Sequence, residues 1–221
     1  MRQLLLDFTQ APAPTFANFV RGGNAELASA LEAALRGELA ERVLYVWGES
    51  GAGKTHLLKS FCAAAQPPCR YVRAEDFQPG DAAGILALDD VERLTEAAQA
   101  ELFHAFNQGA FRFLLAAAPA APRDVALRRD LATRLALGLT YRVLPLSDEE
   151  KRAALAAHAA ARGFALAEEV SAYLLTRGRR DMGSLMAALD SLDRYSLETG
   201  RAITVPLLKA AIQAQAPLAQ P

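Results

Sequence analysis

The eight residues GESGAGKT, from Gly48 to Thr55, restrict the fold of this chain more than any other stretch. They fit the pattern G-x-x-x-x-G-K-[ST], in which a glycine-rich turn joins a buried strand to a helix. The flanking residues have the expected character. RVLYVWG at 42–48 is an aliphatic and aromatic run that predicts a strand, and THLLKSFCAAA at 55–65 predicts the helix. The sequence therefore predicts an α/β domain with a phosphate-binding loop at the end of a strand.

In such a loop, glycines let the backbone turn tightly, so that consecutive N–H groups and the start of the helix face an anion. Lys54 would add a charge for the outer phosphates, and the Thr55 hydroxyl is placed to ligate Mg²⁺. A chance glycine-rich turn is the alternative, and the flanking strand and helix argue against it. We expect ADP or ATP, with Mg²⁺, to be held by the whole run: Gly48, Glu49, Ser50, Gly51, Ala52, Gly53, Lys54 and Thr55.

A second hydrophobic run, ILALDD at 85–90, ends in two carboxylates. Proteins that transfer phosphoryl groups need one acid near the metal and a group that orients the attacking water. We assign Asp89 to the Mg²⁺ site and Asp90 to the catalytic water. Apolar runs that end in acids are common, but the position downstream of the phosphate loop favours the functional interpretation.

The rest of the chain divides into two parts. Strand patterns recur at 69–77, 84–91, 111–118 and 140–146, with helical patterns between them, and this alternation predicts a parallel sheet covered on both faces. Ser147 and Glu150 then form an S-x-x-E capping box, and only helical patterns follow it. We expect three segments: a leader at 1–14, an α/β domain at 15–145 and an all-helical domain at 146–221.

Composition and charge exclude some classes of function. The net charge is −1 and the sequence pI is about 6.3, which argues against a protein that holds duplex DNA by bulk electrostatics. No run approaches the roughly 18 apolar residues of a membrane span, and the apolar leader is too short for a signal peptide. Cys62 and Cys69 match no metal-ligand spacing, so we expect reduced thiols and a cytoplasmic protein.

Two further groups of side chains have ordinary interpretations. The histidines His56, His104 and His158 share no ligand spacing, so we expect packing or capping roles, with His104 on a helix face toward the core. Arg123, Arg128 and Arg129 form a basic cluster. A solvated face is the usual reading of such a cluster, and a contact with a protein partner or with DNA stays open.

The order of these parts resembles the AAA+ ATPases, in which a phosphate-loop sheet is followed by a helical lid. Four segments look like the nucleotide-binding module of the replication initiator DnaA: TFANFV at 15–20, GKTHLL at 54–59, LDDV at 88–91 and FHAFN at 103–107. The resemblance implies that Arg134 in DLATRL is an arginine finger, which acts on the nucleotide of a neighbouring subunit. It also implies that Arg180 in GRRDM is the lid arginine that contacts the phosphates.

Two departures from that family bear on function. The strand FRFLLAAA would normally end in a polar sensor near the terminal phosphate, and this chain has Ala116, Ala117 and Ala118 there. Vigorous ATP turnover by the chain itself is therefore not expected, whereas nucleotide binding is. The helix-turn-helix DNA-binding domain that follows the lid in DnaA is also not found in this sequence.

The leader contains QLLLDF at 3–8, which resembles the peptide by which bacterial proteins bind the sliding clamp of DNA polymerase. The resemblance implies that the amide of Gln3 bonds the rim of the clamp pocket while Leu4, Leu6 and Phe8 enter apolar subsites. The alternative is an edge strand packed against this chain. The chain thus combines a clamp-binding peptide with a DnaA-like module and lacks the helix-turn-helix DNA-binding domain. This combination resembles the Hda family, regulatory inactivators of DnaA.

Three functions therefore compete. The first is a regulator that binds the clamp and stimulates hydrolysis of DnaA-bound ATP, so that it reaches DNA only through the clamp and lowers initiation of replication. The second is an autonomous AAA+ ATPase, such as a helicase loader or initiator-like motor. The third is an adaptor with a vestigial pocket, which the intact GKT, Asp89 and Asp90 argue against. The sequence leaves a homodimer open.

Overall fold

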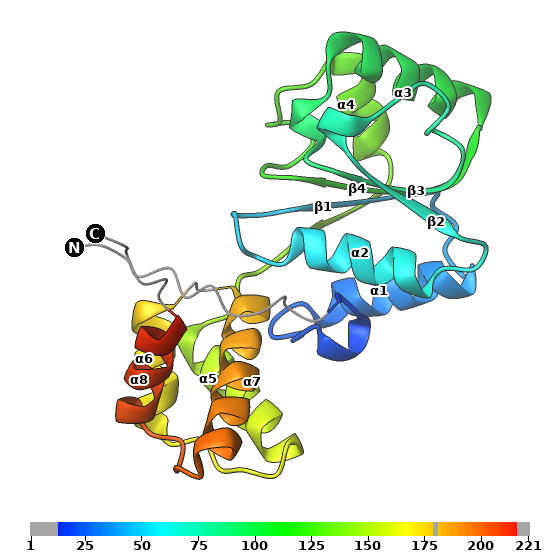
Figure 1. Ribbon diagram of the computed structural model, residues 1–221. Helices are drawn as coiled ribbons and strands as arrows, with labels where there is room; N and C mark the ends of the chain where they lie inside the picture. The colour runs from blue at the N-terminus through cyan, green and yellow to red at the C-terminus, as the bar shows by residue number, and fades with distance from the viewer. Residues whose placement is uncertain (1–12, 179–180, 216–221) are drawn as a thin grey trace, which may run out of the picture. The chain divides into compact units, whose positions relative to one another are not determined.

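The computed structural model describes residues 13–178 and 181–215 of the chain (Figure 1). These residues form two compact units, one spanning Pro14–Pro145 and one that begins at Leu146. Within the described ranges, no helix is both long and apolar enough to cross a membrane. The predictions for Arg180 and for Gln3, Leu4, Leu6 and Phe8 concern positions outside the described residues.

The first unit is built on a five-stranded sheet. Its strands are β1 (Val43–Trp47), β2 (Cys69–Arg73), β3 (Gly84–Asp89), β4 (Phe111–Ala118) and β5 (Leu139–Arg142). They lie in the order β2-β3-β4-β1-β5, and every neighbouring pair is parallel. Because all strands run the same way, their carboxyl ends meet at one edge of the sheet, where ligands bind in open α/β folds.

Helices cover both faces of this sheet, as Figure 1 shows. On one face lie α1 (Ala25–Arg36) and α2 (Lys54–Ala64), and on the other α3 (Glu96–Gln108) and α4 (Arg129–Ala136). Alternate residues of a strand point to opposite faces. In β1, Leu44 and Val46 pack in the layer with α2, and Tyr45 packs in the layer with α3 and α4. Short 3₁₀ turns occupy Phe16–Asn18, Ala74–Asp76 and Val91–Arg93. This architecture confirms the predicted parallel α/β fold.

Helices are the only regular elements of the second unit among its described residues. It contains α5 (Asp148–Ala161), α6 (Glu168–Arg177), α7 (Met182–Thr199) and α8 (Val205–Gln215). The predicted capping box is confirmed, because the Ser147 hydroxyl accepts the Glu150 N–H and the Glu150 carboxylate accepts the Ser147 N–H. Two contacts join α5 to α7. His158 lies 2.7 Å from Asp190, and the guanidinium of Arg162 donates to Asp193 at 2.9 Å.

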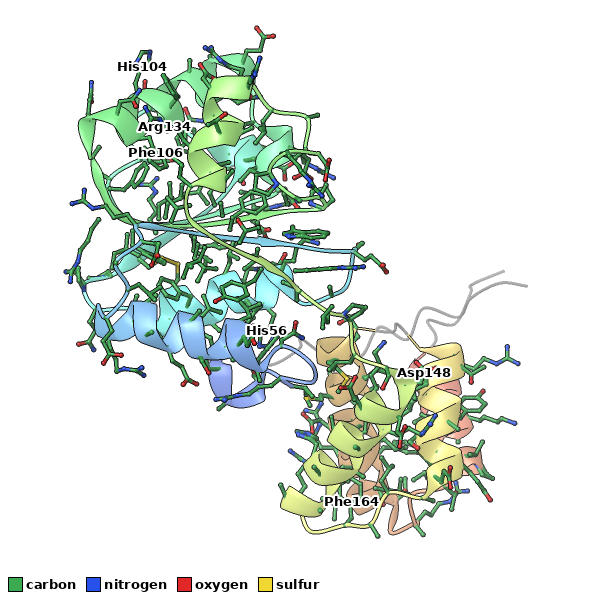
Figure 2. The ribbon with its side chains drawn as sticks, turned by 180° about the vertical axis from the view of Figure 1, so that it is seen from behind. His56, His104, Phe106, Arg134, Asp148 and Phe164 are labelled. Atoms are coloured by element: carbon green, nitrogen blue, oxygen red, sulfur yellow. A yellow bond between two sulfur atoms is a disulfide. The ribbon has the colours of Figure 1, made fainter. Side chains whose placement is uncertain are left out.

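Asn24 stands at the N-cap of α1 but makes no capping hydrogen bond with its side chain. Instead, its amide donates to the carbonyl of Leu144 at 2.9 Å and accepts the Leu144 N–H at 2.7 Å, which ties α1 to the chain after β5. The expectation that His104 faces the core is wrong. His104 is exposed (Figure 2), because Leu102 and Ala105 take the buried face of α3 and successive side chains point in different directions.

The expectation of two reduced thiols is also wrong. Cys62, near the end of α2, and Cys69, the first residue of β2, form a disulfide with their Cα atoms 4.7 Å apart. Only seven positions separate the two cysteines, and the chain reverses between them. The sequence showed no metal-ligand spacing, but spacing alone did not show that the end of the helix and the start of the strand lie side by side.

Candidate nucleotide site

The phosphate loop lies between β1 and α2, and its backbone requires the glycines that the motif supplies. Gly51 and Gly53 have φ values of 80° and 105°, a region that side chains with a Cβ rarely adopt. Gly48 is needed for a different reason. A Cβ at this position would lie 2.6 Å from the carbonyl oxygen of Val143, whose own N–H donates to Trp47 at 2.7 Å. The loop is therefore held against the chain that follows β5.

Lys54 places its charge over this loop. Its Nζ donates to the carbonyl oxygens of Gly48 at 2.7 Å and of Glu49 at 3.0 Å. Both acceptors belong to the loop itself, so the ammonium lies where an anion cradled by the loop N–H groups would meet it. The Glu49 carboxylate lies 3.6 Å from Arg142 at an exposed position. The predicted run from Gly48 to Thr55 thus forms the loop between β1 and α2 and the first two residues of that helix.

Thr55 and Asp89, the predicted Mg²⁺ ligands, are brought together by the structure. The Thr55 hydroxyl donates to Oδ2 of Asp89 at 2.7 Å. Thr55 is exposed, whereas Asp89 is only 1% exposed, so the pair is reached from the Thr55 side. A hydroxyl and a carboxylate are oxygen ligands of the kind Mg²⁺ takes, and Mg²⁺ usually keeps several waters beside one or two carboxylates and substrate phosphates. The donor set therefore fits Mg²⁺, and no cluster of three His, Cys, Asp or Glu suited to a metal occurs among the described residues.

A third residue that the sequence analysis missed contacts Asp89. The Tyr71 hydroxyl donates to the same oxygen, Oδ2, at 2.9 Å, while the N–H of Asp90 donates to Oδ1 at 3.1 Å. Burial, followed by the charge of Asp89, raises the pKa of Tyr71 above its ordinary value. Tyr71 therefore keeps its proton and donates at neutral pH. Tyr71 reaches Asp89 because β2 pairs with β3, and no motif in the sequence shows that pairing.

Asp90, predicted to act on the catalytic water, is held by an arginine. Its carboxylate lies 3.3 Å from the Arg73 guanidinium, which also pairs with Glu75 at 2.7 Å. The backbone of Asp90 has φ 55° and ψ 47°, a left-handed conformation that is uncommon outside glycine. In the described arrangement this carboxylate is thus paired with an arginine at the end of β2.

Glu92 is a second acidic residue that the sequence analysis missed. Its Oε2 atom is buried and has no hydrogen-bond partner among the residues that the structure describes. Burial is the main cause that raises the pKa of Glu92. The charge of Asp90 raises it further, whereas the charges of Arg93 and Lys54 lower it. Glu92 thus follows Asp90 by two positions and has one buried oxygen without a partner among the described residues.

The three alanines at the end of β4 lie in the core. Ala116, Ala117 and Ala118 are fully buried, and β4 runs beside β1 with Ala118 opposite Trp47. Just beyond the strand, the carbonyl of Ala120 accepts the hydroxyl of Tyr45 at 2.9 Å. The structure therefore offers methyl groups at the place where the DnaA-like pattern expects a polar sensor.

Arg134 lies on α4, apart from the phosphate loop. It is half-buried and lines an open hollow of about 860 Å³ together with Phe103, Arg128, Arg129, Asp130 and Thr133. No residue of the phosphate loop lines this hollow. Figure 2 labels Arg134 on the face of the sheet that α3 and α4 cover.

The arginines around this hollow differ in their partners. Arg128 pairs with Asp130 at 2.8 Å, and nearby Arg123 pairs with Asp124 at 3.3 Å. Within the described part of the chain, no carboxylate pairs with the guanidinium of Arg129 or of Arg134. The hollow thus presents two guanidinium groups that the unit itself does not neutralise.

Comparison with known proteins finds a matching sequence model for part of each unit. The sequence model described as "Hda, lid domain" matches residues 148–212, and the one described as "Bacterial DnaA ATPAse domain" matches residues 11–79. Domain III of the replication initiation protein DnaA from Thermotoga maritima has a TM-score of 0.71 and 22% sequence identity, over 93% of this chain and 98% of that one.

Two further solved structures share the fold. AMPPCP-bound DnaA from Aquifex aeolicus has a TM-score of 0.68 and 22% identity, over 85% of this chain and 67% of that one. The Thermotoga maritima RuvB Holliday junction branch migration motor has a TM-score of 0.66 and 17% identity, over 91% of this chain and 72% of that one. The two sequence models, the parallel sheet with its phosphate loop and the helical unit agree: the chain is an Hda/DnaA-like AAA+ protein.

Proposed function

We propose that this protein is a regulatory inactivator of DnaA, which stimulates hydrolysis of DnaA-bound ATP and thereby lowers initiation of DNA replication. The observation that carries the proposal is the contrast between two ends of one unit. The phosphate loop and the Thr55–Asp89 pair suit nucleotide binding, whereas Arg134 lines a separate, open hollow on α4. The match to the Hda lid supports the same assignment.

The bound nucleotide, ADP or ATP, would be held by the loop N–H groups and by Lys54. Thr55 and Asp89 would hold Mg²⁺, which neutralises phosphate charge when bound. From the helical unit, Arg180 would contact the phosphates, as the resemblance to DnaA implies. A nucleotide held in this way organises the surface that meets a partner without itself being consumed.

Slow turnover by the chain itself fits two observations. Methyl groups replace a polar sensor at Ala116–Ala118, and the ion pair with Arg73 occupies the carboxylate of Asp90. Neither feature weakens phosphate binding, which rests on backbone amides and Lys54.

Arg134 would act in the ATP site of DnaA rather than in this chain's own site. An arginine supplied in trans neutralises the charge that develops on the transferred phosphoryl group, and such fingers raise hydrolysis rates by roughly 10³–10⁵-fold. A guanidinium that no carboxylate of its own unit neutralises is available for that contact.

The N-terminal peptide would recruit the protein to the sliding clamp, with Gln3, Leu4, Leu6 and Phe8 as the contacts. DNA would then be reached only through the clamp, and a cytoplasmic location follows from these partners. The proposal for this peptide rests on the sequence resemblance alone.

The test is hydrolysis of DnaA-bound ATP in the presence of DNA-loaded clamp. We expect Arg134→Ala to lose stimulation by about 10³-fold or more while binding ADP as the parent protein does. Arg129→Ala is the matched control, because it removes a neighbouring exposed charge from the same hollow. Full stimulation by Arg134→Ala would refute the assignment of the finger.

A second assay tests recruitment. Replacing Gln3, Leu6 and Phe8 together with alanine is expected to abolish capture of the clamp in a pull-down. Replacing Thr9 and Gln10 changes the same leader outside the peptide and should leave capture intact. Recovery of the clamp by the triple variant would mean that the leader has another role.

The intact Thr55–Asp89 pair also favours a second candidate, an autonomous AAA+ ATPase such as a helicase loader or initiator-like motor. Steady-state ATP hydrolysis by the isolated chain separates the two functions. The regulator predicts little turnover without DnaA, and the motor predicts appreciable turnover, with or without single-stranded DNA.

A further inference from the structure

Asp89 receives hydrogen bonds from three different places in the fold. Thr55 of α2 and Tyr71 of β2 both donate to Oδ2, at 2.7 and 2.9 Å, and the N–H of Asp90 donates to Oδ1. In the part of the chain that the structure describes, Thr55 and Tyr71 are the side chains that donate to this carboxylate. From this arrangement we propose that Tyr71 is a positioning residue, which fixes the Asp89 carboxylate for Mg²⁺; the inference rests on the proposed Mg²⁺ site.

The ring of Tyr71 is itself held in place. Tyr71 pairs with Ala87 of β3, two positions before Asp89, so its side chain needs only to reach along the neighbouring strand. The ring packs against the core layer under α2, and Nζ of Lys59 lies 5.2 Å from the ring centroid. A hydroxyl on a ring packed in this way has little freedom to leave Asp89.

Binding of Mg²⁺ would affect the two side-chain donors to Asp89, Thr55 and Tyr71, in different ways. To ligate Mg²⁺, the Thr55 oxygen must offer it a lone pair, and a hydroxyl that turns toward the metal can release Asp89. Among the described residues, the Tyr71 hydroxyl makes no hydrogen bond other than the one to Oδ2 of Asp89, so it has no second partner to turn toward. The last torsion of an aspartate side chain is broad, so donors on both oxygens are needed to set its angle.

Partners behind a metal ligand are known to matter for affinity. Their loss typically costs about 10–100-fold in metal affinity, because the ligand is no longer oriented. In Tyr71→Phe the ring stays in place and only the hydroxyl is removed. We therefore expect the Mg²⁺ concentration that half-saturates the nucleotide complex to rise about tenfold or more.

The experiment uses the full chain and a fluorescent ADP analogue, titrated first in EDTA and then against increasing Mg²⁺. Tyr141→Phe is the matched control, since Tyr141 also packs against the α2 layer and its hydroxyl has no hydrogen bond among the described residues. Affinity in EDTA should be the same within about twofold for all three proteins, because the loop amides and Lys54 are untouched.

Each outcome has a distinct meaning. A higher half-saturating Mg²⁺ concentration for Tyr71→Phe alone supports the inference. Equal values for both variants and the parent overturn it, even if Tyr71→Phe unfolds at lower urea, because the hydrogen bond would then be only structural. Parent protein whose ADP affinity is unchanged by Mg²⁺ would overturn the proposed Mg²⁺ site and the inference with it. A parent protein that binds the ADP analogue neither in EDTA nor with Mg²⁺ would contradict the proposed nucleotide site, and the inference would be overturned with it.

Discussion

At the scale of single residues, Gly48 and Gly51 show that one motif can require glycine for two reasons. A Cβ on Gly51 meets no atom within 4 Å, so only its φ of 80° opposes a side chain. At Gly48 the Cβ would also press on a backbone oxygen, that of Val143, which cannot move as a flexible side chain can.

This difference predicts the stabilities of two alanine variants. We expect Gly51→Ala to lower the free energy of unfolding by about 1–2 kcal/mol, the cost of a left-handed residue. Gly48→Ala should lose roughly 1–3 kcal/mol more, because the clash adds to the backbone cost. Urea unfolding without nucleotide measures both values. Equal losses would mean that the chain after β5 shifts to make room.

His56 gives a pH prediction. Burial lowers its pKa below the usual 6.5, although its ring lies 3.1 Å from the carbonyl of Thr15, a contact that opposes the shift. The unfolded chain therefore binds a proton more readily than the folded one. Stability from this group is complete above about pH 6.5 and is lost as the pH falls through the lower, folded pKa.

We expect His56→Gln to remove this loss of stability. The free energy of unfolding should then fall more steeply for the parent than for the variant as the pH falls from 7.5 to 5.5. Urea unfolding across this range measures the divergence. His104→Gln is the matched control, since His104 is exposed on α3. A parent protein that loses no more stability on acidification than His56→Gln does would contradict the prediction.

At the scale of elements, the disulfide joins α2 to β2 at the end remote from the phosphate loop. Cys62 and Cys69 close a short loop, and the chain-entropy model gives roughly 2.5 kcal/mol for a crosslink of about eight residues. The double variant Cys62→Ser/Cys69→Ser should therefore lose about that much free energy of unfolding relative to the oxidised protein. Dithiothreitol should destabilise the parent by a similar amount and leave the double variant unchanged. No effect on the parent would favour the free thiols expected from the sequence.

Elements that depend on local pattern could be predicted, and contacts between distant elements could not. The strand before Gly48 and the capping box at Ser147 are set by neighbours within a few residues, and both occur as predicted. Asn24 is a residue type that often caps helices, yet its side chain forms a hydrogen bond with Leu144, 120 positions away. Tyr71 and Arg73 reach Asp89 and Asp90 because β2 and β3 pair, and no spacing along the chain records that pairing.

At the scale of the whole molecule, bound nucleotide should stabilise the fold by mass action. A ligand that binds only the folded state at 100 times its Kd adds about 2.7 kcal/mol to the free energy of unfolding. We expect ADP with Mg²⁺ to raise the unfolding temperature of the parent protein in calorimetry. Lys54→Ala should lose most of that increase, because its ammonium lies over the loop carbonyls of Gly48 and Glu49.

The same measurement tests the arginine that the DnaA-like pattern assigns to the phosphates. If Arg180 contacts the nucleotide, Arg180→Ala should show a smaller temperature rise with ADP and Mg²⁺ than the parent, while its unfolding temperature without nucleotide stays the same. Arg177→Ala removes a charge from the last turn of α6 and is the control. Equal rises in both arginine variants and the parent would restrict the nucleotide site to the unit that carries the phosphate loop.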